Sequence, residues 1–399
     1  MGVFQNNLLA AAASTASGTD TYELYTWGSN GYGQMGDGTS TNKSSPVQIG
    51  DAFFGELDVA GDGLYKIQCK ITNADRHSGV IKADGTLWTW GYGGYGALGH
   101  GNTTSISSPV QVGSDTDWMS ISAQRIGGMT AVKTDGTMWG WGQASSGGSA
   151  QTVNKSSPVQ VGTDTDWHWM MGGGENFGFV LKTNGALYLW GSADSNVLAG
   201  ATLSPIVTPV QVTDKYFDWV GSGTTNAIWG IEKDEGKLWS WGTGSFGQLG
   251  HGNTTTLNSP VQVGTATDWT HAVGQLKNTV ILAKSNGEMY GMGRNDDGVL
   301  GLNNKTQYSS PVQLADKGWA TAGHGMCEQL AHAITDENGD NTGGELWALG
   351  GSPGGEGSAG DGTNSPFSSP VQVGTATDWL MVNTGGPTSS GTKIAIKKS

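Results

Sequence analysis

The stretch WGSNGYGQMGDGT at 27–39 contains a glycine spacing that is typical of nucleotide chemistry. Gly31, Gly33 and Gly36 form the pattern G-x-G-x-x-G, which in dinucleotide-binding proteins brings backbone N–H groups close to a pyrophosphate. Such a site also needs a strand before the loop, a helix after it and an acidic residue about 20 positions further on. The residues that follow here are DGTSTNKSSP, which predict a loop. We therefore interpret the pattern as a tight turn.

Residues that commonly bind metals or act as general bases lack the spacing that such chemistry requires. Asp336, Asn338 and Asp340 resemble the beginning of a calcium-binding loop. Asn341 stands where that loop requires glycine, so we favour an enlarged hairpin. The histidines show no metal-ligand spacing, and we interpret them as surface or turn residues. The sequence thus predicts a non-enzymatic protein with no catalytic residue, metal ligand or cofactor. The histidines are His77, His100, His168, His251, His271, His324 and His332.

The composition is that of a folded, acidic chain. Among 399 residues, 34 Asp and Glu outnumber 20 Lys and Arg, which gives a net charge of −14. This charge repels phosphate backbones, so nucleic acid is not an expected partner. The chain has no run of 18 apolar residues, so no membrane insertion is expected. The two cysteines, Cys69 and Cys327, predict buried thiols and no disulfide framework.

One unit of about 50 residues recurs along the chain, and three markers identify it. The first is an aromatic or apolar segment that ends in glycine, the second is a Pro-Val-Gln segment, and the third is Asp-Trp or Gly-Trp. The first marker stands at 24–28, 87–91, 138–142, 187–191, 238–242, 289–293 and 346–350. The second stands at 45–48, 108–111, 157–160, 208–211, 259–262, 310–313 and 369–372. The third stands at 117–118, 166–167, 218–219, 268–269, 318–319 and 378–379.

Each unit predicts four short antiparallel strands. In residues 117–162 these are DWMSISA, MTAVKTDG, TMWGWG and SPVQVG. Asp135-Gly136 is a hairpin signal, and we expect a two-residue turn with positive φ at both positions. Similar pairs recur at Asp84-Gly85, Asn184-Gly185, Glu235-Gly236 and Asn286-Gly287. Four short strands per repeat are typical of β-propeller blades.

We therefore predict an all-β chain with one domain, a seven-bladed propeller over 21–399, preceded by a tail over 1–20. The chain enters at a third strand and leaves after a second, TKIAIKKS at 392–399. Pairing of these N- and C-terminal strands would close the ring and leave no free sheet edge. Ile394 and Ile396 are the residues that we expect at this closure.

The recurring tryptophans predict packing between blades, because a wedge-shaped sheet needs large side chains where neighbouring blades meet. Five of them directly precede the marker glycine. These are Trp27, Trp90, Trp141, Trp190 and Trp241.

A unit that reads W-G, then G-x-x-G-x-G, then P-V resembles the repeat of the regulator of chromosome condensation family. LWTWGYGGYGALGHGNTTSISSPVQVG at 87–113 and LWSWGTGSFGQLGHGNTTTLNSPVQVG at 238–264 are close to a consensus unit. The resemblance covers 21–399 and implies a propeller. Two units depart from it at 145–153 and 194–202, where the glycine loop is lost, so this loop is a poor candidate for a shared site.

The functions of the family do not follow from the repeat. The founding member exchanges guanine nucleotide on a small GTPase and binds chromatin, whereas this chain has no basic tail for DNA. The plant UV-B receptor, another relative, uses tryptophans clustered with arginines. Arginine occurs here only at positions 76, 125 and 294, so we expect no such surface.

The tail carries the functional hypothesis. Val3, Phe4, Leu8 and Leu9 could form the apolar stripe of a short docking helix. The opening MGVFQNNLLAAAA is similar to leaders on structural proteins of marine tailed phages. Together these features predict a virion component, such as a tail fibre, appendage or capsid decoration. Its tail would dock to other virion proteins in an oligomeric assembly, and its disc would face a host-surface receptor or glycan.

Two alternatives remain open. The same tail could be an export signal, which would make the protein a secreted or cell-surface bacterial binding module. A guanine-nucleotide exchange factor is the third hypothesis. The insertion at 51–66 could contact a partner or simply lengthen a loop.

Overall fold

The structure, a computed structural model, describes most of the chain from Thr21 onward. In the described ranges the regular structure is β-strand, apart from one 3-10 turn, η1 (Gly94–Gly96). No helix there is long and apolar enough to cross a bilayer. The predicted docking residues Val3, Phe4, Leu8 and Leu9, most of the 51–66 insertion and the calcium-like segment lie outside these ranges. The described residues are 21–50, 55–56, 69–124, 127–144, 153–171, 177–191, 206–223, 226–274, 278–314, 319, 325–327, 330–335, 343–350, 359–363, 367–384 and 391–399.

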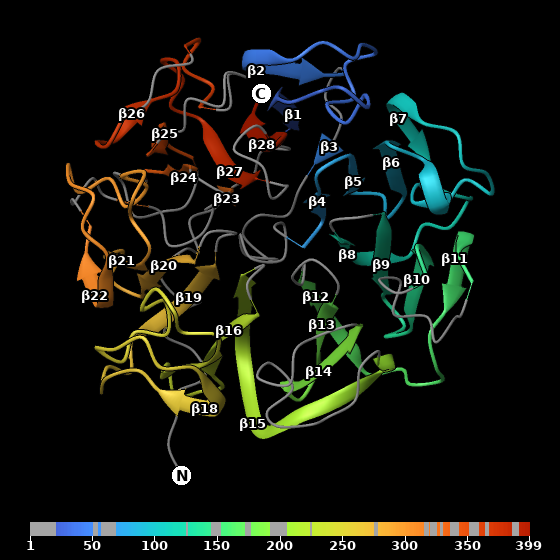
Figure 1. Ribbon diagram of the computed structural model, residues 1–399. Coiled ribbons are helices and arrows are strands. Elements are labelled where there is room, and N and C mark those ends of the chain that lie inside the picture. Colours follow the sequence, from blue (N-terminus) through green and yellow to red (C-terminus); the bar gives the residue numbers. More distant parts are fainter. Residues whose placement is uncertain are drawn as a thin grey trace.

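Four sheets each contain four strands that pair antiparallel with their neighbours in the chain. Figure 1 shows the sheets standing around a common centre, with the first strand of each on the inside and the last at the rim. One sheet contains β4 (Ile71–Asn73), β5 (His77–Ile81), β6 (Leu87–Gly91) and β7 (Ile106–Gln111), and the next contains β8 (Trp118–Gln124), β9 (Gly128–Lys133), β10 (Met138–Gly142) and β11 (Lys155–Gln160). The third contains β19 (Trp269–Gly274), β20 (Thr279–Lys284), β21 (Met289–Gly293) and β22 (Tyr308–Gln313), and the fourth contains β23 (Gly325–Cys327), β24 (Leu330–Ile334), β25 (Leu346–Leu349) and β26 (Val371–Gln372).

A seven-stranded sheet departs from the predicted pattern of separate units. Its strand β15 pairs with β14 through the stretch from Ile206 to Tyr216, and with β16 from Phe217 onward. Other units turn at this point on a glycine with positive φ, such as Gly113 (φ 62°). TDKYF at 213–217 has no glycine, so the strand continues from one unit into the next. The sheet contains β12 (Trp167–Met171), β13 (Phe177–Lys182), β14 (Ala186–Gly191), β15 (Ile206–Gly223), β16 (Ala227–Glu232), β17 (Leu238–Gly242) and β18 (Leu257–Gln262).

Strands from the two ends of the chain lie in one sheet. Here β1 (Thr21–Gly28) lies between β2 (Lys43–Ile49) and β28 (Lys393–Lys398), and β27 (Trp379–Thr384) lies beyond β28. The short strand β3 (Gly55–Glu56) also pairs with β1. Leu24 is the partner of Ile396, and Thr26 is the partner of Ile394. Leu24, Ile394 and Ile396 have no exposed surface and share one apolar cluster.

The hairpins that join the second and third strands of a unit differ from the expected two-residue turns. The hairpin between β5 and β6 is an example. Gly85 has φ 77°, but Asp84 does not have a positive φ. Gly85 donates its N–H to the carbonyl of Lys82 (3.0 Å), and Lys82 donates to the carbonyl of Thr86 (2.9 Å). This is a longer loop, in which only the last position is left-handed. The Asp84 carboxylate accepts the Thr86 N–H (3.0 Å), which stabilises the turn.

Removal of residues 392–399 should destabilise the whole protein, because it takes away the strand that pairs with both β1 and β27. We expect a lower melting temperature or aggregation, measured by thermal unfolding with light scattering. Lys398→Ala, at a partly exposed position, is the control and should melt like the parent. A truncated protein that also melts like the parent would contradict a structural role for this pairing.

Candidate interaction surface

The G-x-G-x-x-G loop between β1 and β2 uses its backbone donors inside the protein. Gly33 donates to the carbonyl of Asn30 (2.9 Å), and Gly36 donates to the carbonyl of Gly33 (3.1 Å). Met35 donates its N–H to the Asn30 side-chain oxygen (2.9 Å). A phosphate would need these donors, so the loop is organised as a turn.

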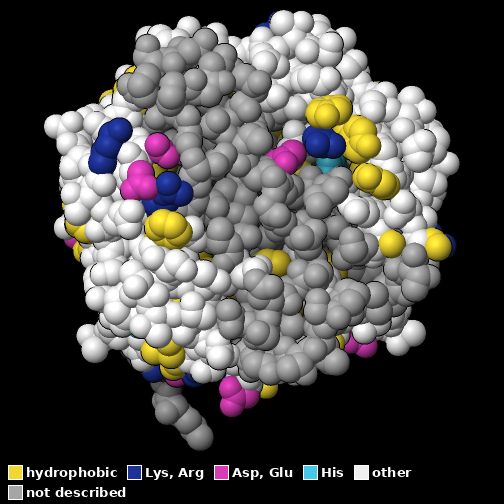
Figure 2. Space-filling model, in the orientation of Figure 1, with side chains coloured by type: hydrophobic (Ala, Val, Ile, Leu, Met, Phe, Trp, Pro, Cys, Tyr) yellow, Lys and Arg dark blue, Asp and Glu magenta, His cyan; other side chains and the backbone are white. Residues whose placement is uncertain are grey.

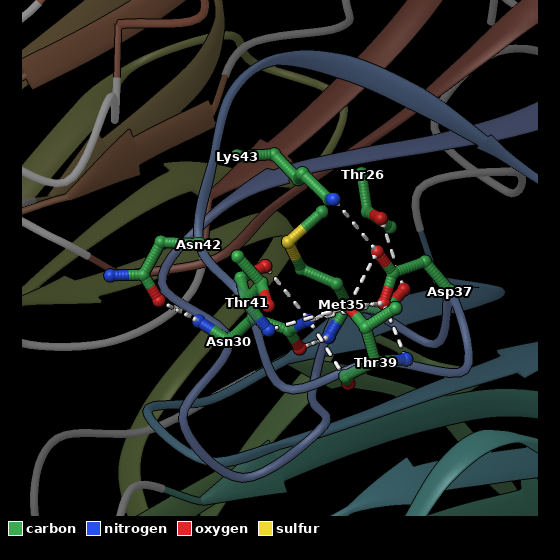
Figure 3. A network of polar contacts seen from close by, with 8 residues as sticks. All are labelled: Thr26, Asn30, Met35, Asp37, Thr39, Thr41, Asn42 and Lys43. Atoms are coloured by element: carbon green, nitrogen blue, oxygen red, sulfur yellow. Dashed lines mark hydrogen bonds and ion pairs between the residues drawn. The ribbon is translucent and has the colours of Figure 1, made fainter.

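The Asn30 side chain fills the centre of the loop, as Figure 3 shows. It has no exposed surface. Its amide nitrogen donates to Asp37 Oδ1 (3.1 Å), to the Thr39 carbonyl (3.1 Å) and to the Thr41 carbonyl (3.2 Å). Its backbone N–H donates to Asn42 Oδ1 (2.8 Å). The loop therefore carries its own polar core.

The same loop packs against the next unit. A Cβ atom at Gly36 would lie 2.7 Å from the indole nitrogen of Trp90, and φ at this glycine is +81°. The Trp90 indole donates to the carbonyl of Gln34 (2.8 Å). Gly38 donates its N–H to the carbonyl of Ser107 in β7 (2.8 Å). We call this set of contacts the glycine joint.

Equivalent contacts recur at other unit boundaries. At each of them, a glycine with positive φ lies against an apolar side chain of the neighbouring strand that carries the first sequence marker. The last of them brings the loop at 359–362 onto β1 through Trp27, and Gly362 donates to the carbonyl of Ser44 in β2 (2.9 Å). A Cβ at the glycine would lie 2.9 Å from Trp141 for Gly99, 2.8 Å from Met292 for Gly250, 3.1 Å from Leu349 for Gly301 and 2.7 Å from Trp27 for Gly360.

The five tryptophans that precede the marker glycine are buried, with at most 1% of their surface exposed. Trp141 donates its indole N–H to the carbonyl of Ala97 in the preceding loop (2.9 Å). Trp241 stacks on Phe217, with ring centroids 6.1 Å apart. Trp190 lies over Gly178, where a Cβ would meet its ring at 2.3 Å. These positions are packing sites and are closed to a ligand.

Gly36→Ala should destabilise the protein more than Gly113→Ala does. Both glycines have positive φ, but a Cβ at Gly113 would meet nothing within 4 Å. We therefore expect about 1 kcal/mol of loss for Gly113→Ala from backbone strain alone. Gly36→Ala should lose about 1–3 kcal/mol more, since the new Cβ overlaps Trp90. Chemical denaturation of both variants measures the difference, and equal losses would show that the joint contact is unimportant.

An exposed cluster of three tyrosines and one arginine lies beside the first glycine joint. The guanidinium of Arg76 lies 5.0 Å from the ring centroid of Tyr32 and 5.7 Å from that of Tyr92. Tyr32 and Tyr92 meet edge to face at 5.4 Å, and Tyr92 and Tyr95 do so at 6.5 Å. Tyr32 and Tyr95 are each 43% exposed. We call Tyr32, Arg76, Tyr92 and Tyr95 the tyrosine patch.

The patch is formed by loops at the same end of neighbouring sheets. Tyr32 comes from the loop after β1, Arg76 from the loop between β4 and β5, and Tyr92 and Tyr95 from the loop after β6. Figure 2 shows hydrophobic side chains gathered beside a basic one at the upper right of this face. This patch was not predicted from the sequence. The signal was the aromatic residue in GYG at 31–33 and 94–96, which stands at an equivalent position in the two units.

A second arginine–aromatic pair occurs at another boundary. The guanidinium of Arg294 lies 5.2 Å from the ring centroid of Phe246. Its Nε also contacts Asp296 Oδ2 at 2.6 Å, so its charge is neutralised. In the described part of the chain Arg76 forms no ion pair, which leaves its charge available to a ligand.

Lysines near the hairpins that join the second and third strands of a unit, at the opposite end of the strands, are also neutralised by aspartates. Lys133 Nζ lies 2.7 Å from Asp115 and 3.0 Å from Asp117, and 4.8 Å from the ring centroid of Trp118. Burial would lower the pKa of Lys133, but hydrogen bonds to the two carboxylates outweigh burial and raise it. Lys182 and Lys284 also lie over aromatic rings and beside aspartates. We interpret these clusters as structural.

The histidines only partly match the expectation of surface or turn positions. His77 in β5 and His332 in β24 are buried, so the expectation is wrong for them. His100 Nε2 lies 2.7 Å from Thr89 Oγ1, and the equivalent His251 lies 2.9 Å from Ser240 Oγ. Burial lowers the pKa of both. Among the described residues no group of three or more His, Cys, Asp or Glu side chains could hold a metal ion.

His77 should make the protein less stable in mild acid. Burial lowers its pKa to about 4 from an ordinary value of 6.5, so below pH 6.5 the unfolded chain binds the proton more readily than the folded chain does. The free energy of unfolding should therefore fall from pH 6.5 to about 4, by at most about 3 kcal/mol from this group. His77→Gln should make this pH slope shallower. Measurements at pH 8, where the imidazole is neutral in both states, give the cost of the substitution itself. An unchanged slope would contradict the assignment.

The sheets and their joints define a β-propeller built from repeated units. Four segments match the model of the "Regulator of chromosome condensation (RCC1) repeat", at residues 23–59, 84–123, 235–274 and 286–321. These four segments therefore match the RCC1 repeat, in agreement with the sequence resemblance. The matches do not include the two units that lack the glycine loop.

Curated relatives match only part of this chain. Protein RCC2 homolog from Xenopus laevis is 38% identical over 115 residues, which is 28% of this chain and 21% of that protein. E3 ubiquitin-protein ligase HERC2 from Homo sapiens is 32% identical over 99 residues, which is 25% of this chain and 2% of that protein. The matched segments therefore span about a fifth or less of these relatives.

Solved structures share the fold over nearly the whole chain. Yeast RCC1 (Prp20), in its structure bound to Kap60, has a TM-score of 0.75 at 15% identity and covers 95% of this chain and 89% of its own. Human WBSCR16 has a TM-score of 0.71 at 15% identity, with 95% and 99% covered. At this identity the likeness establishes the RCC1-type propeller fold and nothing about activity.

Proposed function

We propose that the units form a closed ring of seven blades. If β15 serves both of the sheets that it joins, the described strands provide seven four-stranded units, in agreement with the seven sequence markers. The pairing of β1 with β28 supports closure. So does the glycine joint between Gly360 and Trp27, which repeats at the two ends of the chain the contact made between successive units.

On this ring the protein acts as a non-enzymatic interaction module. The observation that carries the proposal is the tyrosine patch, because tyrosine and arginine are enriched where proteins bind partners. Its residues come from two neighbouring units, so the glycine joint holds them in a fixed arrangement. The ring supplies rigidity, and the loops at one end of the sheets supply the contact.

For the biological setting we propose a virion, and this part of the proposal rests on the sequence alone. Residues 1–20 dock the ring to other virion proteins in an oligomeric assembly, and the exposed loops face a host-surface receptor or glycan. The alternative setting is a secreted or cell-surface binding module, in which the same residues direct export. In either setting the ring performs the same task.

Nucleotide exchange is a second candidate, and the match to RCC1 repeats is the observation that favours it. Prp20p from Saccharomyces cerevisiae, whose structure shares this fold, is described by its binding to Gsp1p and histones. If this chain were an exchange factor, it would bind a nucleotide-free small GTPase and accelerate nucleotide release. Detection of this exchange activity would contradict the proposal that the protein is a non-enzymatic interaction module.

Comparison of the full-length protein with a 21–399 form tests the setting. We expect the native protein to retain its first residues. Only the full-length form should sediment with purified particles or assemble into oligomers, measured by intact mass and analytical ultracentrifugation. If the native protein begins near residues 14–18 and both forms are identical monomers, the tail is an export signal and the virion setting is wrong.

A further inference from the structure

We propose that the tyrosine patch binds an acidic saccharide, a chain of sugar rings that bears carboxylate groups. This inference rests on the proposed interaction function and names its ligand. The patch offers three aromatic rings, three phenol groups and one guanidinium. Each of these groups has a counterpart on a uronic-acid oligosaccharide.

The aromatic rings provide the stacking surface. Tyr32, Tyr92 and Tyr95 follow one another with centroid separations of 5.4 and 6.5 Å. Because adjacent rings meet edge to face, part of each outer ring stays open to solvent. The C–H faces of a sugar carry a weak positive charge and suit the negative face of an aromatic ring. The tyrosine hydroxyls can exchange hydrogen bonds with the sugar hydroxyls.

Arg76 provides the charge selectivity. It is exposed, its guanidinium lies over two rings, and in the described part of the chain it forms no ion pair. Arg294 and Lys133, in contrast, each contact an aspartate. A planar guanidinium binds a carboxylate through two parallel hydrogen bonds. The patch therefore favours a sugar that carries a carboxylate over a neutral one.

The other residues of the surface argue against a protein or nucleic-acid ligand. Tyrosine and arginine also occur in protein-protein interfaces, but such an interface uses about 20–30 residues on each side, whereas the patch consists of four. Single-stranded nucleic acid also stacks on aromatic rings, but it needs a positively charged groove. The patch itself contains one arginine, and the chain carries a net charge of −14, so the patch does not provide such a groove.

Tyr95 adds an argument from backbone conformation. Its φ is +62°, a left-handed value that is uncommon for a bulky residue. Equivalent residues Tyr32 and Phe246 do not have a positive φ. The strained conformation places the Tyr95 ring next to Tyr92 and near Gly127 of the following unit. Strain of this kind is often found at binding sites.

The test is binding of the full-length protein to a uronic-acid oligosaccharide, such as trigalacturonic acid, and to its neutral methyl ester. Isothermal titration calorimetry measures both affinities. We expect the acid to bind at least about tenfold more tightly than the ester, the ratio that a charge-assisted hydrogen bond provides. Arg76→Gln should remove this preference, and Tyr95→Ala should weaken both ligands. Tyr216→Ala, at a tyrosine of 46% exposure in β15, is the matched control and should change neither.

Two outcomes overturn the inference. One is no binding of the acid, and the other is binding that Arg76→Gln and Tyr95→Ala leave unchanged while both variants melt like the parent. A panel of acidic and neutral saccharides on an array extends the first measurement to other acidic sugars. If no acidic saccharide binds but Arg76→Gln abolishes adhesion of intact particles or cells, the ligand class is wrong and the interaction module stands. If the variants also leave adhesion unchanged, the proposed function fails as well.

Discussion

The architecture depends on one steric constraint, the close approach of a glycine to a large side chain of the next unit. At Gly36, Gly99 and Gly360 a single additional carbon would lie within 3 Å of a tryptophan indole. The left-handed backbone at these positions makes glycine doubly necessary, because other residues rarely adopt it. Where the glycine loop is present, the contact sets the distance between neighbouring sheets, and the first of these loops has an internal polar core centred on Asn30.

This constraint explains why a nucleotide-like sequence pattern has a structural role. The glycine spacing is the same as in a phosphate loop, but the N–H groups are bound within the loop and to the neighbouring unit. The tyrosine patch is a by-product of the same loop. Tyr32 stands between two of its glycines, and the joint to the next unit brings that ring against Tyr92. A surface for recognition thus lies at a seam that is rigid for reasons of packing.

Much of the fold could be predicted from the sequence because the markers repeat. Alternating residues, marker glycines and Pro-Val-Gln segments define the strands, and the buried positions of Trp90 and Trp141 follow from their recurrence. The hairpin type could not be predicted, since Asp-Gly fits both the shorter turn and the longer loop. The burial of His77 was also missed, because His77 begins a strand that carries none of the three markers, so no repeated pattern identified its position as buried.

The candidate surface was less accessible to sequence reasoning. Its residues come from three separate loops, and Arg76 has no equivalent in other units. Only the three-dimensional arrangement brings its guanidinium over two tyrosine rings. The continuous strand β15 also could not be predicted, although in this case the sequence signal was visible. The missing glycine was visible at 213–217, but its effect on the sheet depends on how both neighbouring strands pair.

The sheet that contains β1 and β28 has a consequence for protein synthesis. Thr21 and Ser399 lie 378 positions apart in the sequence, yet their side-chain oxygens are 2.7 Å apart. Domains generally fold as units during synthesis, so a domain whose strands all interlock completes its fold only when its last strand is available. The first strand of this chain must therefore wait, with one edge unpaired, until almost every other strand has been made. Exposed strand edges invite pairing with other chains, so this interval is the time at which nascent copies are most exposed to aggregation.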